Sequence, residues 1–227
     1  HGANDLFVVV ASCSASKNDS VHVPRDPKIV SPSYYLDDPI LISRLEEIRG
    51  KIFADPRALI EHKITYAFDL YVKEGYAYRK LLKNNYNRLR GRLTGNDIEW
   101  FFLSGGYGII HALEKARKYQ ATFNRSIAYQ KDIPYTAKLW NSVLTQICDA
   151  IFSKFHPEGV YIFGSKDYTQ FVKRTDYWKR SNSIKMFEST GSAGPHWLSP
   201  ILDDLVNAIL ENKIEDFDTH YQKFVKQ

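Results

Sequence analysis

The chain has 227 residues, 44% of them hydrophobic, and a formal net charge of +5. Because it contains no run of about eighteen apolar residues and does not begin with a charged segment followed by an apolar stretch, we expect neither a membrane span nor a signal peptide. The two cysteines, Cys13 and Cys148, are far apart and have no metal-ligand spacing, which indicates a reduced, cytoplasmic protein without a metal site.

No linker rich in Pro, Ser or Gly divides residues 1–227, so a single α/β domain is expected. In chain order the pattern predicts a strand at 6–11, a long loop at 18–38, a helix at 39–50, a helical region at 56–92 with a break at Gly75, a strand at 98–103, a helix at 134–155, a strand at 160–165, a helix at 166–174, a strand at 183–188, and helices at 198–210 and 213–225. Strands that alternate with helices imply crossover connections and helices on both faces of a sheet. We therefore predict a three-layer α/β/α domain with a central, mostly parallel, four-stranded sheet.

Three of the predicted strands end in loops that combine Ser, Gly and Ala with a titratable residue. These loops read SCSASKND after residue 11, SGGYGIIH after residue 103 and STGSAGPHW after residue 188. The carboxyl ends of parallel strands form the edge where several loops converge on one crevice, and glycine lets backbone N–H groups approach a ligand. We expect one composite binding site, with the candidate residues Cys13, Ser14, Ser16, Lys17, Ser104, Gly105, Gly106, Tyr107, Tyr119, Ser192 and Gly194.

Basic and aromatic side chains gather in two segments, 76–92 and 173–185. Cations neutralise phosphates and aromatic faces stack on exposed bases, so these segments favour a nucleic-acid partner. The alternative is that they are solvated helix faces whose aromatic rings point into the core. The candidate DNA-binding residues are Arg79, Lys83, Arg88, Arg90, Arg92, Lys173, Arg174, Lys179 and Arg180.

Three short motifs resemble the pattern of the YaaA-like proteins. They are SCSASK at 12–17, AFDLY at 67–71 and LSGGYGII at 103–110, the last followed by Tyr119. Related loops occur in the glycosylase-like domain of archaeosine synthases, and both groups resemble the uracil-DNA-glycosylase-type α/β fold. The wider set includes bacterial anti-phage enzymes that excise glucosylated hydroxymethylcytosine from viral DNA. The resemblance covers residues 6–170, and it implies this fold and a DNA partner.

Two positions depart from the pattern of that family. Gly105 stands where the pattern usually has Ala, which is expected to enlarge or loosen the pocket, and Gln120 stands where an Asp is expected after Tyr119. The last loop, GSAGPHWLSP, is similar to the His-containing HPSP loop of uracil-DNA glycosylases. This similarity gives His196 the matching role.

Cleavage of an N-glycosidic bond requires a stabilised cationic sugar, a leaving base that accepts charge or a proton, and a positioned water. His196 is the first candidate to assist the leaving base. Glu114 is the first candidate carboxylate because it follows the glycine turn by less than three helical turns, while Asp167 is a second candidate that could instead cap a helix. Lys17 could bind a phosphate, or act as an amine nucleophile if burial lowered its pKa.

The sequence thus supports three hypotheses of function. The first is a DNA glycosylase, without metal or cofactor, that flips a modified base into the crevice and excises it in anti-phage defence, a glucosylated base being one candidate substrate. Tyr107, Tyr119, Phe123 and Trp197 are the candidates for stacking on the base. The second is a non-catalytic DNA-binding stress-response protein of the YaaA type. The third is a hydrolase of small nucleosides or nucleotides, favoured if the basic clusters are scattered over the surface.

Overall fold

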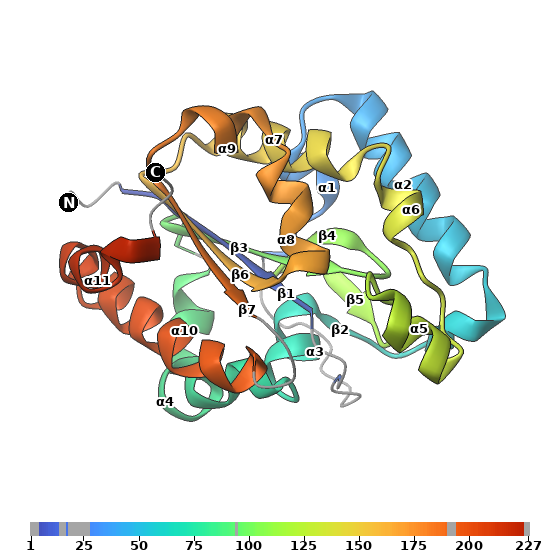
Figure 1. The fold of residues 1–227 in the computed structure, drawn as a ribbon, viewed down its shortest axis with the longest axis horizontal. Helices are drawn as coiled ribbons and strands as arrows, with labels where there is room; N and C mark the ends of the chain where they lie inside the picture. Colours follow the sequence, from blue (N-terminus) through green and yellow to red (C-terminus); the bar gives the residue numbers. More distant parts are fainter. Residues whose placement is uncertain (1–4, 14–16, 18–27, 94, 190–193, 225–227) are drawn as a thin grey trace.

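The computed structural model describes residues 5–13, 17, 28–93, 95–189 and 194–224, apart from the side chains of residues 76 and 194–197. Within these residues, five strands form the central sheet in the order β4-β3-β1-β6-β7 (Figure 1). The strands β1, β3, β6 and β7 are parallel, and β4 pairs antiparallel with β3. Their bounds are β1 (Phe7–Ser12), β3 (Ile98–Ser104), β4 (Gly108–His111), β6 (Gly159–Ser165) and β7 (Ile184–Ser189).

The four parallel strands are those expected from the sequence, but the prediction of a four-stranded sheet is wrong because it omits β4. After Ser104 the chain turns through residues 105–107 and returns along β3, so that Ser104 pairs with Gly108. Gly108 has a φ of 74°, in the left-handed region that favours glycine, and a Cβ atom there would lie 2.6 Å from the ring of Trp140. The glycine-rich loop is therefore the tight turn of a β-hairpin.

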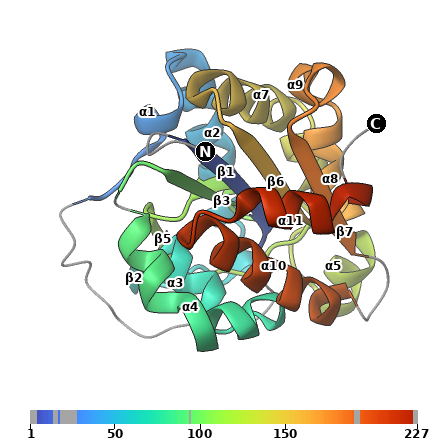
Figure 2. The same ribbon diagram turned by 90° about the vertical axis from the view of Figure 1, so that its left-hand side faces the viewer.

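Helices cover both faces of the sheet (Figures 1 and 2). Over one face lie α7 (Leu144–Phe155), α8 (Lys166–Lys173) and α9 (Asp176–Arg180). Over the other lie α4 (Arg79–Arg92), α10 (Gly194–Leu210) and α11 (Ile214–His220). The remaining elements are α1 (Pro32–Tyr35), α2 (Pro39–Phe53), α3 (Ala67–Val72), α5 (Arg125–Lys131), α6 (Ala137–Trp140), the short strands β2 (Ile64–Tyr66) and β5 (Lys115–Arg117), and the 3-10 turns η1 (Pro56–Ala58), η2 (Tyr76–Tyr78) and η3 (Gln222–Phe224).

Two of the predicted helical regions are interrupted in the structure. The region 56–92 contains β2, which pairs antiparallel with β5, so only α3 and α4 are α-helical there. Ile64 and Thr65 are β-branched, and they suit a strand as soon as a partner strand is available. The helix expected at 134–155 is likewise divided into α6 and α7.

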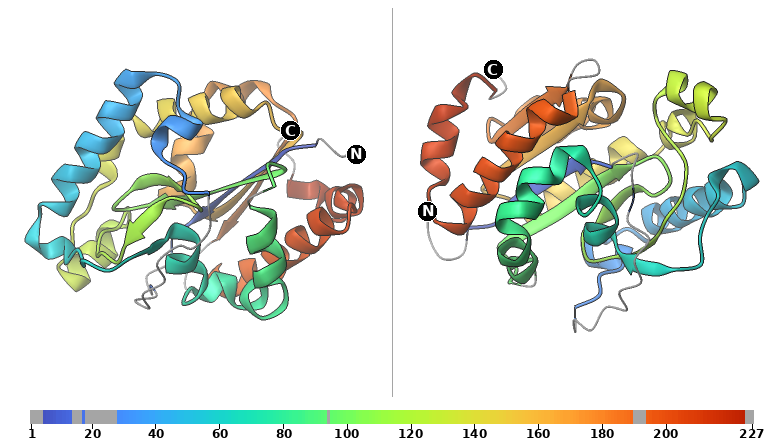
Figure 3. Two further views of the ribbon diagram at one scale, coloured as in Figure 1. Left: turned by 180° about the vertical axis from the view of Figure 1, so that it is seen from behind. Right: turned by 90° about the horizontal axis from the view of Figure 1, so that it is seen from below.

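Helices α4 and α10 lie side by side beneath the sheet (Figure 3), and buried polar groups join them. Asn84 and Asn85 donate from Nδ2 to the two carboxylate oxygens of Asp203, at 2.8 and 2.7 Å. The backbone N–H of Lys80 donates to Ser199 Oγ at 3.2 Å. The amino-terminal half of α4 is therefore held against α10 at Ser199 and Asp203.

The strands β1 and β3 are buried along almost their whole length, as expected for central strands covered on both faces. The buried side chains on both faces belong to one hydrophobic cluster, which includes the large rings of Trp100, Trp140 and Phe163. Among the described residues, no helix is both long enough and apolar enough to cross a lipid bilayer.

Candidate functional site

The carboxyl ends of β1, β3 and β6 meet at one edge of the sheet. These strands end at Ser12, Ser104 and Ser165, and β1 lies between the other two. The connection that follows β1 leads to β3 on one side of it, and the connection that follows the β3–β4 hairpin leads to β6 on its other side. The order of the strands therefore reverses direction at β1. In open α/β sheets this switch point is where a crevice forms outside the strand ends. We call this end of the sheet the carboxyl edge.

A group of buried hydroxyls lies at the carboxyl edge, made by Tyr71, Ser104 and Tyr119; we call it the hydroxyl cluster. Tyr71 OH donates to Ser104 Oγ at 3.0 Å and lies 2.7 Å from Tyr119 OH, which also hydrogen-bonds Ser104 Oγ. Burial raises the pKa of both tyrosines well above its ordinary value. The cluster therefore consists of neutral hydroxyls that exchange donor and acceptor roles.

Lys17 brings an amine to the hydroxyl cluster. Its side chain is almost fully buried, at 7% exposure, and its Nζ lies 4.5 Å from the centroid of the Tyr119 ring. Burial lowers the pKa of Lys17; Cys13 opposes this effect, and the nearby cations Lys131 and Lys118 add to it. A lowered pKa increases the fraction of neutral amine at a given pH, which is the property that the sequence alone could not establish.

Tyr168, in the first turn of α8, connects the end of β1 to the segment after Tyr119. Cys13 Sγ lies 3.6 Å from Tyr168 OH, and Thr122 Oγ1 lies 3.3 Å from the same oxygen. The Tyr168 ring packs on Phe123, with the centroids 4.6 Å apart. Phe123 is therefore buried in the protein interior, and in the described structure its ring is not accessible for stacking on a base.

Asp167 lies one residue earlier, after the carboxyl end of β6. Its Oδ2 accepts a hydrogen bond from Asn124 Nδ2 at 2.9 Å, and Ser165 rather than Asp167 is the N-cap of α8. The alternative of a capping role is therefore wrong. Asn124 in turn bonds through its backbone N–H to Thr122 Oγ1, which places this carboxylate in the same network as Tyr168.

The structure thus brings together five of the predicted binding residues, namely Cys13, Lys17, Ser104, Tyr107 and Tyr119. Ser14, Ser16 and Ser192 lie outside the described residues, as does the side chain of His196. The backbone of Gly194 and His196 forms the first turn of α10, near Ser199 and the start of α4. Functional candidates that the sequence did not single out are Tyr71, Lys118, Thr122, Lys131 and Tyr168.

Gly105 and Gly106 do not provide open space, so the expectation of an enlarged pocket is wrong. A Cβ atom on Gly105 would lie 2.4 Å from the carbonyl oxygen of Ala121 and 2.6 Å from Thr122 N. A Cβ atom on Gly106 would lie 2.8 Å from the Tyr119 ring. Both glycines are needed because the hairpin turn packs directly against the segment that carries Tyr119.

Glu114 lies away from the hydroxyl cluster, and the prediction that it follows the turn on a helix is wrong. Because β4 runs antiparallel to β3, it carries the chain back from the carboxyl edge before Glu114 is reached. Glu114 is buried, pairs with Arg49 Nη1 at 3.1 Å and accepts hydrogen bonds from Tyr35 OH and the His111 backbone N–H. Arg49 also donates to the carbonyl oxygen of Tyr107 at 2.9 Å. Glu114 therefore supports the hairpin.

The two basic clusters lie on opposite faces of the sheet and do not form one surface (Figures 1 and 2). The cluster on α8 and α9 is engaged at Lys173, whose Nζ lies 2.8 Å from Glu188, and at Arg174, which donates to Gln170 at 2.8 Å. Lys179 and Arg180 are exposed on α9, which lies just before the amino end of β7.

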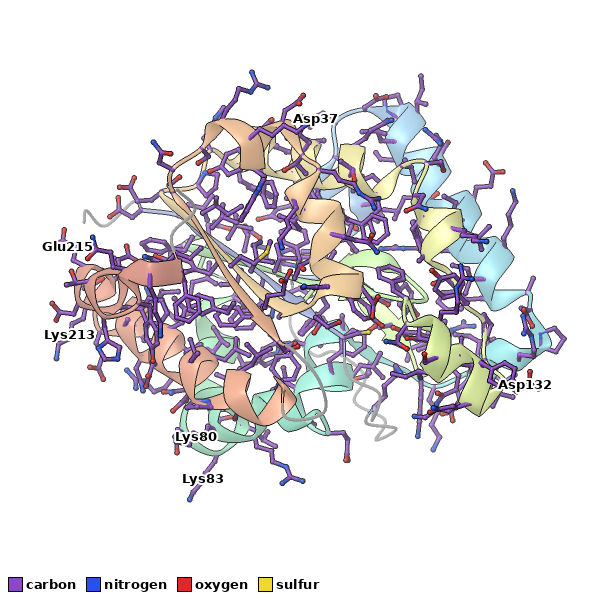
Figure 4. All side chains as sticks on the ribbon, viewed as in Figure 1. Asp37, Lys80, Lys83, Asp132, Lys213 and Glu215 are labelled. Carbon is purple, nitrogen blue, oxygen red and sulfur yellow. The ribbon has the colours of Figure 1, made fainter. Side chains whose placement is uncertain are left out.

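The cluster on α4 is divided along the helix. Tyr78, the residue before α4, donates to the carbonyl oxygen of Ser12 at 2.6 Å, so the exposed Arg79, Lys80 and Lys83 lie near the carboxyl edge. Figure 4 shows Lys80 and Lys83 pointing away from the body of the protein. At the other end, the side chains have partners within the chain: Arg88 contacts Glu211, Arg90 lies over the Tyr66 ring and Arg92 pairs with Asp97.

A separate groove of about 650 Å³ lies on the side of the Tyr119 ring where Phe53 packs. Phe53, Ile60 and Tyr107 line it, and the exposed Lys115 and Arg117 stand at its margin. Its volume is within the range of ligand pockets. Its lining has no amine as deeply buried as Lys17, so we take the carboxyl edge as the candidate site.

The described residues contain no group of three His, Cys, Asp or Glu side chains arranged to hold a metal ion. A scan against protein-family models finds no match to this chain, and a search of curated proteins finds none either.

Replacement of Gly105 by Ala is expected to destabilise the protein by about 1–3 kcal/mol, because the added methyl group meets the backbone of Ala121 and not a side chain that can rotate. Gly91→Ala is the control: nothing lies within 4 Å of its Cβ position in α4, and the change should be neutral or stabilising by about 0.5–1 kcal/mol. Urea unfolding measures both. Equal stability of the two variants would contradict the packing described for the turn.

Replacement of Glu114 by Ala is expected to cost about 3–5 kcal/mol, because it leaves the buried Arg49 without its carboxylate partner. Asp37→Ala breaks the exposed Asp37–Lys154 pair and should cost less than about 1 kcal/mol. Thermal and denaturant unfolding provide the comparison. A Glu114→Ala protein with wild-type stability would return Glu114 to the catalytic candidates.

Proposed function

We propose that the chain is a DNA glycosylase that excises a modified base, such as a glucosylated one, at the carboxyl edge and leaves an abasic site. The observation that carries this proposal is the buried Lys17 amine beside the hydroxyl cluster at the switch point of the sheet. A desolvated group of donors of this kind can stabilise charge on a departing base far more strongly than donors in water. We further propose that the fold is of the uracil-DNA-glycosylase type, with β3, β1, β6 and β7 as its parallel strands.

The residues at the carboxyl edge can divide the work of the reaction. Tyr71 and Tyr119 remain neutral because burial raises the pKa of each, so they can donate hydrogen bonds to an oxygen or nitrogen of the leaving base. Asp167 is the carboxylate that can orient a water or stabilise the cationic sugar. In this proposal His196 keeps its assigned role, since α10 begins shortly after the carboxyl end of β7, which runs parallel to β6.

DNA would approach from the side of the carboxyl edge. Lys118 and Lys131 lie close enough to Lys17 to affect its pKa, and the first turns of α4 add exposed cations. Phosphates of a bound strand can be neutralised by these side chains while one nucleotide enters the crevice. In keeping with the proposed defence role, the protein would act on viral DNA in the cytoplasm.

Incubation with plain, hydroxymethylated and glucosylated phage DNAs, followed by alkali, should give strand breaks on one modified DNA only. Asp167→Asn should reduce these breaks by about 100-fold or more if its carboxylate acts in the reaction. Asp37→Asn, an exposed change on the far side of the protein (Figure 4), should leave them unchanged. The absence of breaks on every DNA, with retained binding, would favour the non-catalytic YaaA-type protein instead.

The double change Lys80→Ala with Lys83→Ala is expected to weaken duplex binding and to lower the slope of log affinity against log salt by about one for each lost phosphate contact. Lys179→Ala with Arg180→Ala, on the opposite face, is the control and should leave binding unchanged. Fluorescence anisotropy at several salt concentrations measures this. A larger loss in the control pair would place the DNA on the α9 side.

The separation of the two basic clusters favours a second candidate, a hydrolase of small nucleosides or nucleotides. Such an enzyme needs the crevice but no extended phosphate-binding surface. A panel of free nucleosides and nucleotides, assayed by release of the base, distinguishes it from the DNA glycosylase. Turnover of the free compounds together with salt-independent, negligible DNA affinity would favour this second candidate.

A further inference from the structure

We propose that Lys17 gives the carboxyl edge a second activity: its amine condenses with the aldehyde of an abasic deoxyribose and cleaves the strand by β-elimination. This inference rests on the proposed function in so far as DNA must enter the crevice. It does not require that the protein itself removes a base. It concerns abasic sites in DNA, whatever process creates them.

The environment of Lys17 is that of a nucleophile and not that of a phosphate-binding lysine. A lysine that binds phosphate acts as a hydrated point charge on a flexible stem. Lys17 is instead almost fully buried, with its Nζ against the Tyr119 ring, 4.5 Å from the centroid. Burial lowers the pKa of Lys17, and the cations Lys131 and Lys118 act in the same direction, while Cys13 acts against it. Burial next to other cations is the arrangement that activates lysine amines toward carbonyl carbons.

The hydroxyl cluster supplies proton transfer at the same place. Tyr119, whose ring contacts the amine, hydrogen-bonds through its hydroxyl to Tyr71 and to Ser104. Because each hydroxyl can donate and accept, the three can pass a proton to the carbinolamine oxygen as it leaves as water. The hydroxyl cluster thus supplies the proton transfer that imine formation needs and that an isolated surface lysine does not have.

The reaction balances with groups at this edge. The nitrogen lone pair of Lys17 attacks C1′ of the ring-opened sugar, and loss of one water leaves a protonated imine. A base, for which Asp167 is the candidate carboxylate, removes a proton from C2′. The electron pair forms the C2′–C3′ double bond, and the C3′–O bond breaks with the 3′ phosphate as the leaving group. Water then hydrolyses the imine and restores the amine.

The test uses an abasic site made beforehand. A duplex containing one uracil is treated with a separate uracil-removing enzyme, purified, and mixed with the full chain in the presence of sodium borohydride, which reduces the imine to a stable secondary amine. Wild-type protein should form a covalent adduct visible on a denaturing gel. Peptide mapping by mass spectrometry should place the modified side chain at residue 17.

Two variants and a control separate chemistry from folding and binding. Lys17→Arg keeps the charge and Lys17→Met suits the buried position, and both should lower adduct formation by about tenfold or more. Lys213→Arg, an exposed change just before α11 that lies outside the proposed site, should trap like the wild type. Thermal unfolding confirms that each variant is folded. The proposal is overturned if Lys17→Arg and Lys17→Met form as much adduct as the wild type. It is also overturned if wild-type protein binds the abasic duplex but forms no adduct.

The outcomes also separate this inference from the proposed glycosylase. Adduct formation at Lys17, together with no strand breaks on any modified DNA either before or after alkali, would support the lyase and argue against base excision. Alkali-labile sites on a modified DNA, with no adduct formed on the abasic duplex, would support base excision and argue against lyase activity.

Discussion

The close approach of the β3–β4 turn to the segment 121–122 is the constraint on which the carboxyl edge depends. Gly105 lies against the backbone of Ala121, and its carbonyl oxygen accepts hydrogen bonds from Thr136 Oγ1 at 2.6 Å and Trp140 Nε1 at 3.3 Å. This packing holds the chain between Tyr119 and Thr122 over the strand ends. The tyrosine ring then covers Lys17 on one side, and Thr122 meets Tyr168 on the other. A larger residue at position 105 would displace the tyrosine and the threonine together.

Two buried polar networks follow from this arrangement, and they differ in what they can do. Arg49 and Glu114 form an ion pair; backbone carbonyls accept hydrogen bonds from Arg49, neutral donors bond Glu114, and the network stabilises the hairpin. At the carboxyl edge Lys17 lies against the Tyr119 ring of the hydroxyl cluster, and burial together with the nearby Lys131 and Lys118 lowers its pKa. The first network fixes charges in place, whereas the second weakens the preference for a charged amine. Perturbation of this second kind is typical of functional sites.

Much of the parallel sheet could be predicted from the sequence, since β1, β3 and β6 are largely apolar runs of the kind found in strands covered on both faces. The hairpin could not, because the turn at Gly108 depends on a left-handed glycine and on Trp140, which lies far along the chain. Because β4 was not predicted, Glu114 was wrongly placed on a helix beside the glycine turn. The sequence directed attention to the three loops, and Lys17 was among their candidates, yet its burial depends on Tyr119 and on the fold around it. Tyr71 was visible only within the motif AFDLY, and Tyr168 only as a residue after a strand. The basic segments are visible in the sequence, but the sequence does not tell which ends of α4 and α8 lie near the crevice.

The central claim is that the carboxyl edge, and not the groove beside Phe53 or the face of α9, receives the nucleotide. A crystal structure of the protein with a duplex containing one tetrahydrofuran abasic analogue tests this most directly. We expect the analogue to lie at the ends of β1 and β3, within reach of Lys17 Nζ and Asp167, with phosphates near Lys80 and Lys131. An analogue bound in the groove lined by Phe53 and Tyr107, or DNA lying across α9, would contradict the claim.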